Sequence, residues 1–152
     1  MIWLYFSTMV RVVPAQAGTT MSKPDERVRP VILLIEDEPA VARLTELVLD
    51  SAGYAVERAS DHATALALIT QHSYDLIVAD TDRGQRTTSL ADAKPLLAAA
   101  RCPVLLFSAH RFPAAEIAAA GFRGMIRKPF DIDDFLNVVK VTLQQSLPVT
   151  AV

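Results

Sequence analysis

The chain has 152 residues, enough for one domain with a full hydrophobic core but too few for two ordinary domains. Its formal net charge is −2 and its lysines and arginines are dispersed, which argues against a nucleic-acid-binding surface and a basic membrane patch. The single cysteine excludes an internal disulfide, and the three histidines lack metal-ligand spacing.

The first 29 residues differ in character from the rest. The apolar start MIWLYFSTMV has no preceding positive charge and about half of the roughly 20 residues that a membrane span needs. We interpret residues 1–29 as an unstructured or mis-assigned extension, with Met21 as a possible true start and an export signal as the minority alternative. The expected domain covers residues 30–146, a short tail covers 147–152, and the expected location is cytoplasmic.

Three continuous apolar runs, at 31–35, 76–79 and 104–107, predict buried strands. Continuous rather than alternating apolarity indicates burial on both faces, as in a parallel sheet covered by helices. Two weaker strands are expected at 54–58 and 124–127.

Helical patterns lie between these strands. Pro39 suits a first turn, and Val41, Leu44 and Val48 follow at helical spacing. Asp61 is expected to cap the second helix. The third is expected to open with a capping box at residues 89–92, with Pro95 bending its first turns. The fourth is a short helix over 113–120, and the fifth follows a cap at Asp131.

The alternation predicts an α/β fold of five strand–helix units with right-handed crossovers. The expected architecture is a doubly wound, flavodoxin-like, five-stranded parallel sheet with the strand order 2-1-3-4-5. In that order the ligand site lies beyond the carboxyl ends of strands 1 and 3.

Acidic residues follow those two strands. Glu36 and Asp37 come after the first strand, and Asp80 ends the third. Because these strands are expected to be neighbours, the three carboxylates would repel one another and raise one another's pKa values. A Mg²⁺ ion, which prefers hard oxygen ligands, would relieve that repulsion.

The next two strands also end in polar groups. Ser108 ends the fourth strand, and Lys128 follows the fifth. A cation-held carboxylate, a hydroxyl and an ammonium together form a phosphoryl pocket. The acid with access to phosphorus would then be a nucleophile that forms an aspartyl phosphate.

The segments VILLIEDEP, YDLIVAD, PVLLFSA and GMIRKPF resemble, in order and spacing, the response-regulator receiver domain (CheY-like) of two-component and phosphorelay signalling. The resemblance covers about residues 31–145 and implies a cis peptide bond at Lys128-Pro129. The resemblance implies that Asp37 binds Mg²⁺ directly, that Glu36 binds it through water, and that Asp82 contributes its backbone carbonyl. It also implies that Asp80 is phosphorylated and that Ser108 and Lys128 contact the phosphoryl group.

The chain departs from the family at several places. Met125 stands where the family usually has an aromatic residue that couples phosphorylation to output. The loop TDRGQRTTS is unusual, and the segment between Ser108 and Lys128 is about two residues short. In the family, the residues at the positions of Asp82 and His110 tune the lifetime of the phosphoryl group.

Only LPVTAV follows the last expected helix, so a stand-alone receiver, a signalling protein rather than a conventional enzyme, is expected. The family's partners are histidine kinases or histidine phosphotransfer proteins. Its output face is formed by the fourth helix, fifth strand and fifth helix, where Phe112, Phe122 and Met125 are candidate contacts or core residues, the core being the better interpretation for Phe122.

Two alternatives stay open. A degenerate receiver would bind its partner without phosphate, as Met125 and the unusual loop suggest. Asp80-Thr-Asp82 also resembles the first motif of haloacid-dehalogenase-like phosphatases, although Gly84 stands where that motif has threonine or valine. In that class the second aspartate would be the acid/base.

Overall fold

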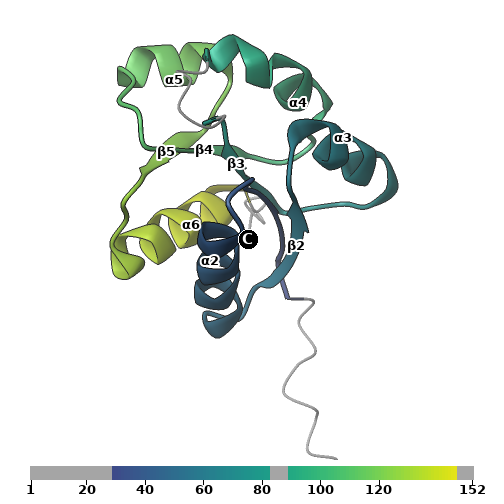
Figure 1. Cartoon of the computed structure of the whole chain (residues 1–152), viewed down its shortest axis with the longest axis vertical. Helices are drawn as coiled ribbons and strands as arrows, with labels where there is room; N and C mark the ends of the chain where they lie inside the picture. Colours follow the sequence, from purple (N-terminus) through teal and green to yellow (C-terminus); the bar gives the residue numbers. More distant parts are fainter. Residues whose placement is uncertain (1–28, 83–88, 147–152) are drawn as a thin grey trace, which may run out of the picture.

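The computed structural model describes residues 29–82 and 89–146. Its sheet has five parallel strands in the order β2-β1-β3-β4-β5, the order expected from the sequence (Figure 1). The strands are β1 (Val31–Ile35), β2 (Ala55–Ala59), β3 (Leu76–Asp80), β4 (Val104–Ser108) and β5 (Gly124–Arg127). Residues 1–28 of the expected N-terminal extension at 1–29, and the whole expected tail at 147–152, lie outside the described residues. Arg29 is described, and its Nε donates to the carbonyl oxygen of Gly53 at 3.0 Å.

Helices cover both faces of the sheet (Figure 1). One face packs against α3 (His62–Gln71), α4 (Lys94–Ala99) and α5 (Ala114–Ala120), and the other against α2 (Pro39–Ser51) and α6 (Ile132–Ser146). This double cover explains the continuous apolar strands, because every residue of β3 and β4 is buried. No helix in the described ranges 29–82 and 89–146 is long and apolar enough to cross a membrane.

The buried side of α2 differs in detail from the apolar spacing. Its buried residues are Ala42, Thr45, Val48 and Leu49, whereas Leu44 is 50% exposed. Thr45 can occupy the core because its hydroxyl donates to the carbonyl oxygen of Val41 at 2.8 Å. The local hydrogen bond therefore allows the polar residue Thr45 to be buried, although the apolar spacing predicted that Leu44 would be buried instead.

The expected third helix is split by Pro95. A 3₁₀ turn, η1 (Leu90–Ala93), precedes α4, and the proline falls in the first turn of α4. The side chain of Ser89 accepts a hydrogen bond from the amide of Ala91 at 3.2 Å. A capping box would instead bond the amide of Asp92, so that detail of the prediction was wrong.

The helix caps at Asp61 and Asp131 are confirmed. Asp61 Oδ1 accepts a hydrogen bond from the Thr64 amide at 2.7 Å. Asp131 Oδ1 accepts from the amides of Asp133 and Asp134 at 2.9 and 3.1 Å. Each carboxylate satisfies amides that the first turn of a helix leaves unpaired.

Replacing Asp61 with alanine is expected to lower the free energy of unfolding by about 1 kcal/mol, because the first turn of α3 loses its cap. Asp61→Asn keeps an acceptor oxygen and should change stability by only a few tenths of a kcal/mol, roughly the spread among good capping residues. Urea denaturation of both variants measures the difference. Equal losses in the two variants would contradict a capping role.

The candidate output contacts pack toward the interior. Phe122 is buried, and Phe112 and Met125 are partly buried against the same core cluster. The core interpretation of Phe122 is therefore confirmed. The shortened segment before β5 is accommodated by the seven-residue helix α5, which ends at Gly121 with a left-handed φ of 106°.

Candidate functional site

The expected polar residues meet at one edge of the sheet. Asp80 and Ser108 are the last residues of β3 and β4, and Glu36 and Lys128 directly follow β1 and β5. Since parallel strands present their carboxyl ends at the same edge, the topology brings together residues that are up to 92 positions apart in the chain.

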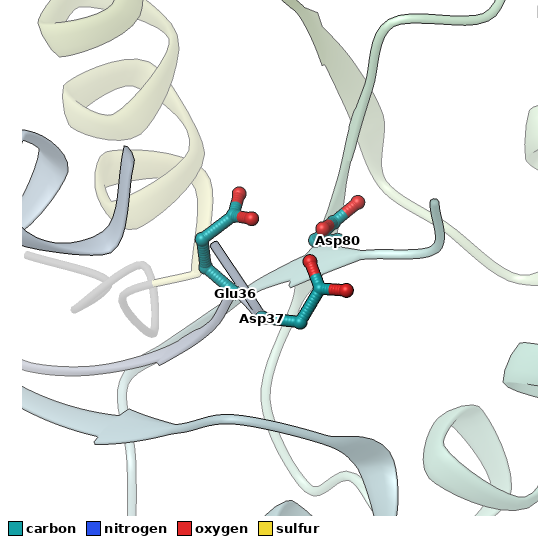
Figure 2. Close-up of side chains that lie close together, drawn as sticks. All are labelled: Glu36, Asp37 and Asp80. Carbon is teal, nitrogen blue, oxygen red and sulfur yellow. The ribbon is translucent and has the colours of Figure 1, made fainter. Parts of the chain in front are cut away.

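Three carboxyl groups form the acidic part of this site. Oxygens of Glu36, Asp37 and Asp80 all lie within 4.8 Å of one another. Figure 2 shows the three side chains gathered at the ends of their strands, with the carboxyl group of Asp37 beside that of Asp80. Glu36 and Asp80 are buried, whereas Asp37 is exposed, so the cluster is open to solvent on the Asp37 side.

Lys128 supplies the positive charge of the site. Its ammonium nitrogen lies 2.9 Å from Glu36 Oε2 and 3.3 Å from Asp80 Oδ1. It also lies 4.7 Å from the centre of the Phe107 ring. Burial alone would lower the pKa of Lys128, but its hydrogen bond to Glu36 and the Asp80 charge outweigh burial and raise that pKa. The expected cis peptide bond at Lys128-Pro129 is confirmed.

Asp80 occupies a buried position that disfavours its ionised form. Burial raises the pKa of Asp80 to about 8, with a further increase from Glu36, despite the opposing effects of the Asp82 amide and Lys128. A cation bound beside Asp80 would oppose this effect, because an adjacent positive charge stabilises the ionised carboxylate. The three oxygen donors are the ligand type that suits Mg²⁺.

The raised pKa of Asp80 predicts a pH-dependent stability in the metal-free protein. The unfolded chain ionises near the ordinary pKa of 3.8, while the folded protein keeps its proton to about 8. The folded state therefore binds more protons between these values, and its stability falls as pH rises. With EDTA present, Asp80→Asn should be more stable than wild type by several kcal/mol at roughly pH 8, since each unit of difference between the folded and unfolded pKa contributes about 1.4 kcal/mol.

Urea denaturation at a series of pH values checks this expectation. The difference between Asp80→Asn and wild type should shrink as the pH falls toward 3.8, and it should be smallest below about pH 3, where Asp80 is protonated in both the folded and the unfolded wild type. Mg²⁺ should also shrink it, because a bound cation stabilises the ionised carboxylate. A difference that stays constant with pH would contradict the burial of an ionisable carboxyl group.

The Asp82 side chain has contacts that the sequence did not predict. Its carboxylate accepts hydrogen bonds from the Ser108 hydroxyl at 2.6 Å and the Ala109 amide at 2.8 Å. The backbone amide of Asp82 donates to Asp80 Oδ1 at 2.7 Å. The sequence analysis gave Asp82 a metal-ligating backbone carbonyl and an influence on phosphoryl lifetime, but it did not predict these hydrogen bonds, because no spacing rule relates an acid to a hydroxyl 26 residues later.

His62 is a second residue that the sequence analysis missed. Its Nε2 lies 3.0 Å from the backbone carbonyl oxygen of Asp80, from the first residue of α3. A carbonyl oxygen only accepts, so Nε2 carries the proton. This hydrogen bond ties the start of α3 to the end of β3 and fixes the backbone from which the Asp80 carboxyl group projects.

Comparison with protein families identifies residues 32–140 as a response regulator receiver domain. The chain belongs to this family. Receiver domains are phosphorylation-based signalling domains of two-component systems rather than conventional enzymes, and they bind Mg²⁺ at an acidic pocket. Membership argues against the haloacid-dehalogenase-like alternative.

Several transcriptional regulators are similar to this receiver. The transcriptional regulatory protein GlrR of Escherichia coli K12 is 28% identical over 121 residues, which are 78% of this chain and 27% of GlrR. The DNA-binding dual master transcriptional regulator RpaA of Synechocystis is 31% identical over 130 residues, 77% of this chain and 50% of RpaA. The chain therefore spans between about a quarter and a half of these relatives.

Solved structures show the same fold. A putative response regulator from Chloroflexus aurantiacus aligns with a TM-score of 0.65 at 28% identity, covering 76% of this chain and 98% of that one. The Vibrio cholerae chemotaxis protein CheY4 aligns with a TM-score of 0.65 at 24% identity, covering 75% and 98%. The expected CheY-like, flavodoxin-like architecture is thus confirmed.

Proposed function

We propose that Asp80 accepts a phosphoryl group from the phosphohistidine of a histidine kinase or phosphotransfer protein. The position of Asp80 carries this proposal: it is a buried acid 3.3 Å from Lys128, at the end of the central strand β3. Receiver domains interact with these two classes of phosphodonor protein, which supports the choice of donor.

In the proposed reaction, a carboxylate oxygen of Asp80 attacks the phosphorus atom. The bond from phosphorus to the histidine nitrogen breaks, and that nitrogen keeps the electron pair and takes up a proton. The product is an aspartyl phosphate on this chain. Hydrolysis by water would return the carboxylate and release inorganic phosphate, so the domain would catalyse only its own phosphorylation and dephosphorylation.

The surrounding donors would hold the phosphoryl oxygens. Lys128 contributes a positive charge, and the fully buried residue Ser108 contributes a hydroxyl group. The Ala109 amide, now hydrogen-bonded to a carboxylate, is a third donor at the same edge. Positioned donors of this kind stabilise the charge that develops during phosphoryl transfer.

The acidic residues fit the Mg²⁺ ion that receivers bind. Both Glu36 oxygens already have partners, because Oε1 accepts from the Glu38 amide and Oε2 from Lys128. This supports direct binding through Asp37 and Asp80 and binding through water at Glu36, with the Asp82 backbone carbonyl as a further ligand. When bound, Mg²⁺ would neutralise negative charge on the carboxylates and on the phosphoryl group.

The output face is proposed to comprise α5, β5 and α6. Met125 lies on β5 and packs with Phe112 against the core, so a change at the phosphoryl site could reach this face through β4 and β5. The relatives GlrR and RpaA carry their receivers on longer chains. The proposal therefore covers phosphorylation of the receiver and its output face, and it does not include the stand-alone form expected from the sequence.

Incubation with acetyl phosphate, with and without Mg²⁺, tests the function. Intact-mass measurement should show one added phosphoryl group that depends on Mg²⁺ and is removed by hydroxylamine, which cleaves acyl phosphates. No gain in mass from acetyl phosphate or from a phosphorylated histidine phosphotransfer protein would contradict the proposal.

The hydrogen bonds of Asp82 favour one second candidate, a receiver that binds its partner without phosphate. The Ser108 hydroxyl already has a carboxylate partner in the unphosphorylated protein. Partner capture that is unchanged by Asp80→Ala and by Mg²⁺ with acetyl phosphate would favour this candidate.

A further inference from the structure

The Asp82 carboxylate lies among the donors of the phosphoryl pocket. One oxygen accepts from the Ser108 hydroxyl at 2.6 Å, and the other accepts from the Ala109 amide at 2.8 Å. The Lys128 ammonium is 3.9 Å away, and the side chain of Asp82 is only 14% exposed. Two short hydrogen bonds to separate oxygens fix the carboxylate in a single orientation.

The direction of the Ser108 hydrogen bond follows from its second partner. The His110 amide donates to Ser108 Oγ at 3.0 Å. The hydroxyl therefore accepts on one side and directs its own hydrogen to Asp82. A chain of donors from His110 through Ser108 ends on the negative charge of Asp82, and each bond in such a chain strengthens the next.

We infer that the Asp82 carboxylate is a built-in anion that occupies the place of the phosphoryl oxygens and must be displaced when Asp80 is phosphorylated. This inference rests on the proposed function, which assigns the same hydroxyl and amide to the phosphoryl group. A single hydroxyl hydrogen and a single amide hydrogen cannot serve two anions fully. The two negative groups would also repel each other, because both carboxylates lie around the same ammonium: Lys128 Nζ is 3.3 Å from Asp80 Oδ1 and 3.9 Å from Asp82 Oδ2.

Asp82 is thus a positioning residue that acts in two ways. It holds the Ser108 hydroxyl and the Ala109 amide directed at the pocket before any phosphoryl group arrives. It also competes with that group for the same donors. Ser108 and Ala109 therefore bind the phosphoryl group less favourably than they would without the Asp82 carboxylate. Phosphorylation would then exchange one anion for another, rather than fill an empty pocket, and would move the Asp82 side chain away from Ser108 and Ala109.

Asp82→Asn tests the competition without touching the Asp82 backbone. Ser108 and Ala109 donate to different oxygens of Asp82, so asparagine, which has an NH₂ group in place of one oxygen and no negative charge, would lose one of these hydrogen bonds in the same orientation. Asp61→Asn is the matched control. Asp61 and Asp82 both line a cavity of about 330 Å³ at this edge of the sheet. Asp61→Asn removes one negative charge from that cavity, and asparagine preserves the cap of α3.

The measurement is a titration of ¹⁵N-labelled protein with beryllofluoride, a phosphoryl analogue, in the presence of Mg²⁺. Asp82→Asn should bind it about tenfold more tightly than wild type, the scale of one lost charge-assisted contact, and Asp61→Asn should bind nearly as wild type. The Ala109 amide proton of the analogue-free protein should shift upfield in Asp82→Asn alone, because it loses a carboxylate acceptor.

Three results would overturn the inference. Equal beryllofluoride affinities in wild type and Asp82→Asn would mean that no anion is displaced. If both proteins bound the analogue tightly in that case, the proposed function would still hold. An equal increase in beryllofluoride affinity in Asp82→Asn and Asp61→Asn would mean that the effect comes only from the loss of one negative charge near the site. Binding by none of the three proteins would overturn the proposed function, and the displacement with it.

Discussion

Lys128→Met is expected to slow phosphoryl uptake from acetyl phosphate by about a hundredfold at saturating Mg²⁺, the usual effect of losing one preorganised donor. The lysine nitrogen lies 2.9 Å from Glu36 and 3.3 Å from Asp80, so it holds both buried acids and is positioned to meet a phosphoryl oxygen. Methionine keeps an unbranched side chain of similar length but removes the positive charge, which lies 4.7 Å from the centre of the Phe107 ring. Intact-mass time courses measure the rate.

Lys140→Met is the matched control, because Lys140 is an exposed lysine on α6 away from the site. Its uptake rate should equal that of wild type. If Lys128→Met reacts as fast as this control, Lys128 serves only to balance the buried charges and not the transfer.

Asp37→Asn is expected to weaken Mg²⁺ binding by about a hundredfold, since even partners outside the ligand shell typically contribute 10–100-fold to metal affinity. Asp37 is the exposed member of the acidic cluster, so its oxygens are accessible to an entering ion. Asparagine keeps the shape and one carbonyl oxygen but removes a negative charge. Isothermal titration calorimetry with Mg²⁺ measures the change in affinity.

Glu38→Gln removes the same charge one residue away and serves as the control. Glu38 is exposed, and its side chain does not cap α2. Its loss should reduce Mg²⁺ affinity by roughly twofold through long-range electrostatics alone. Equal weakening in the two variants would contradict a ligand role for Asp37.

The fold could be predicted largely from the apolar runs. Strands β1, β3 and β4 are buried on both faces, so their sequences are continuously apolar and easy to recognise. Single helix positions were less predictable: Leu44 is half exposed while Thr45 is buried, because packing of α2 and a local hydrogen bond together override side-chain polarity.

The members of the site were predictable because strand order alone brings the ends of parallel strands together. Their hydrogen-bond partners were not. The bond between Asp82 and Ser108 depends on how the chain after β3 lies across the edge of the sheet, and the bond from His62 to the Asp80 carbonyl depends on where α3 begins. Apolar periodicity carries no information on such contacts, so a residue can be placed at a site before its role there is known.

The central claim is that Asp80 is the phosphoacceptor, and locating the phosphoryl group in the chain tests it most directly. The protein is treated with Mg²⁺ and acetyl phosphate, the acyl phosphate is trapped by borohydride reduction, and the modified residue is mapped by peptide mass spectrometry. The account predicts modification at Asp80 alone and none in Asp80→Asn. Modification at Asp37 or Asp82, or equal labelling of Asp80→Asn, would contradict it.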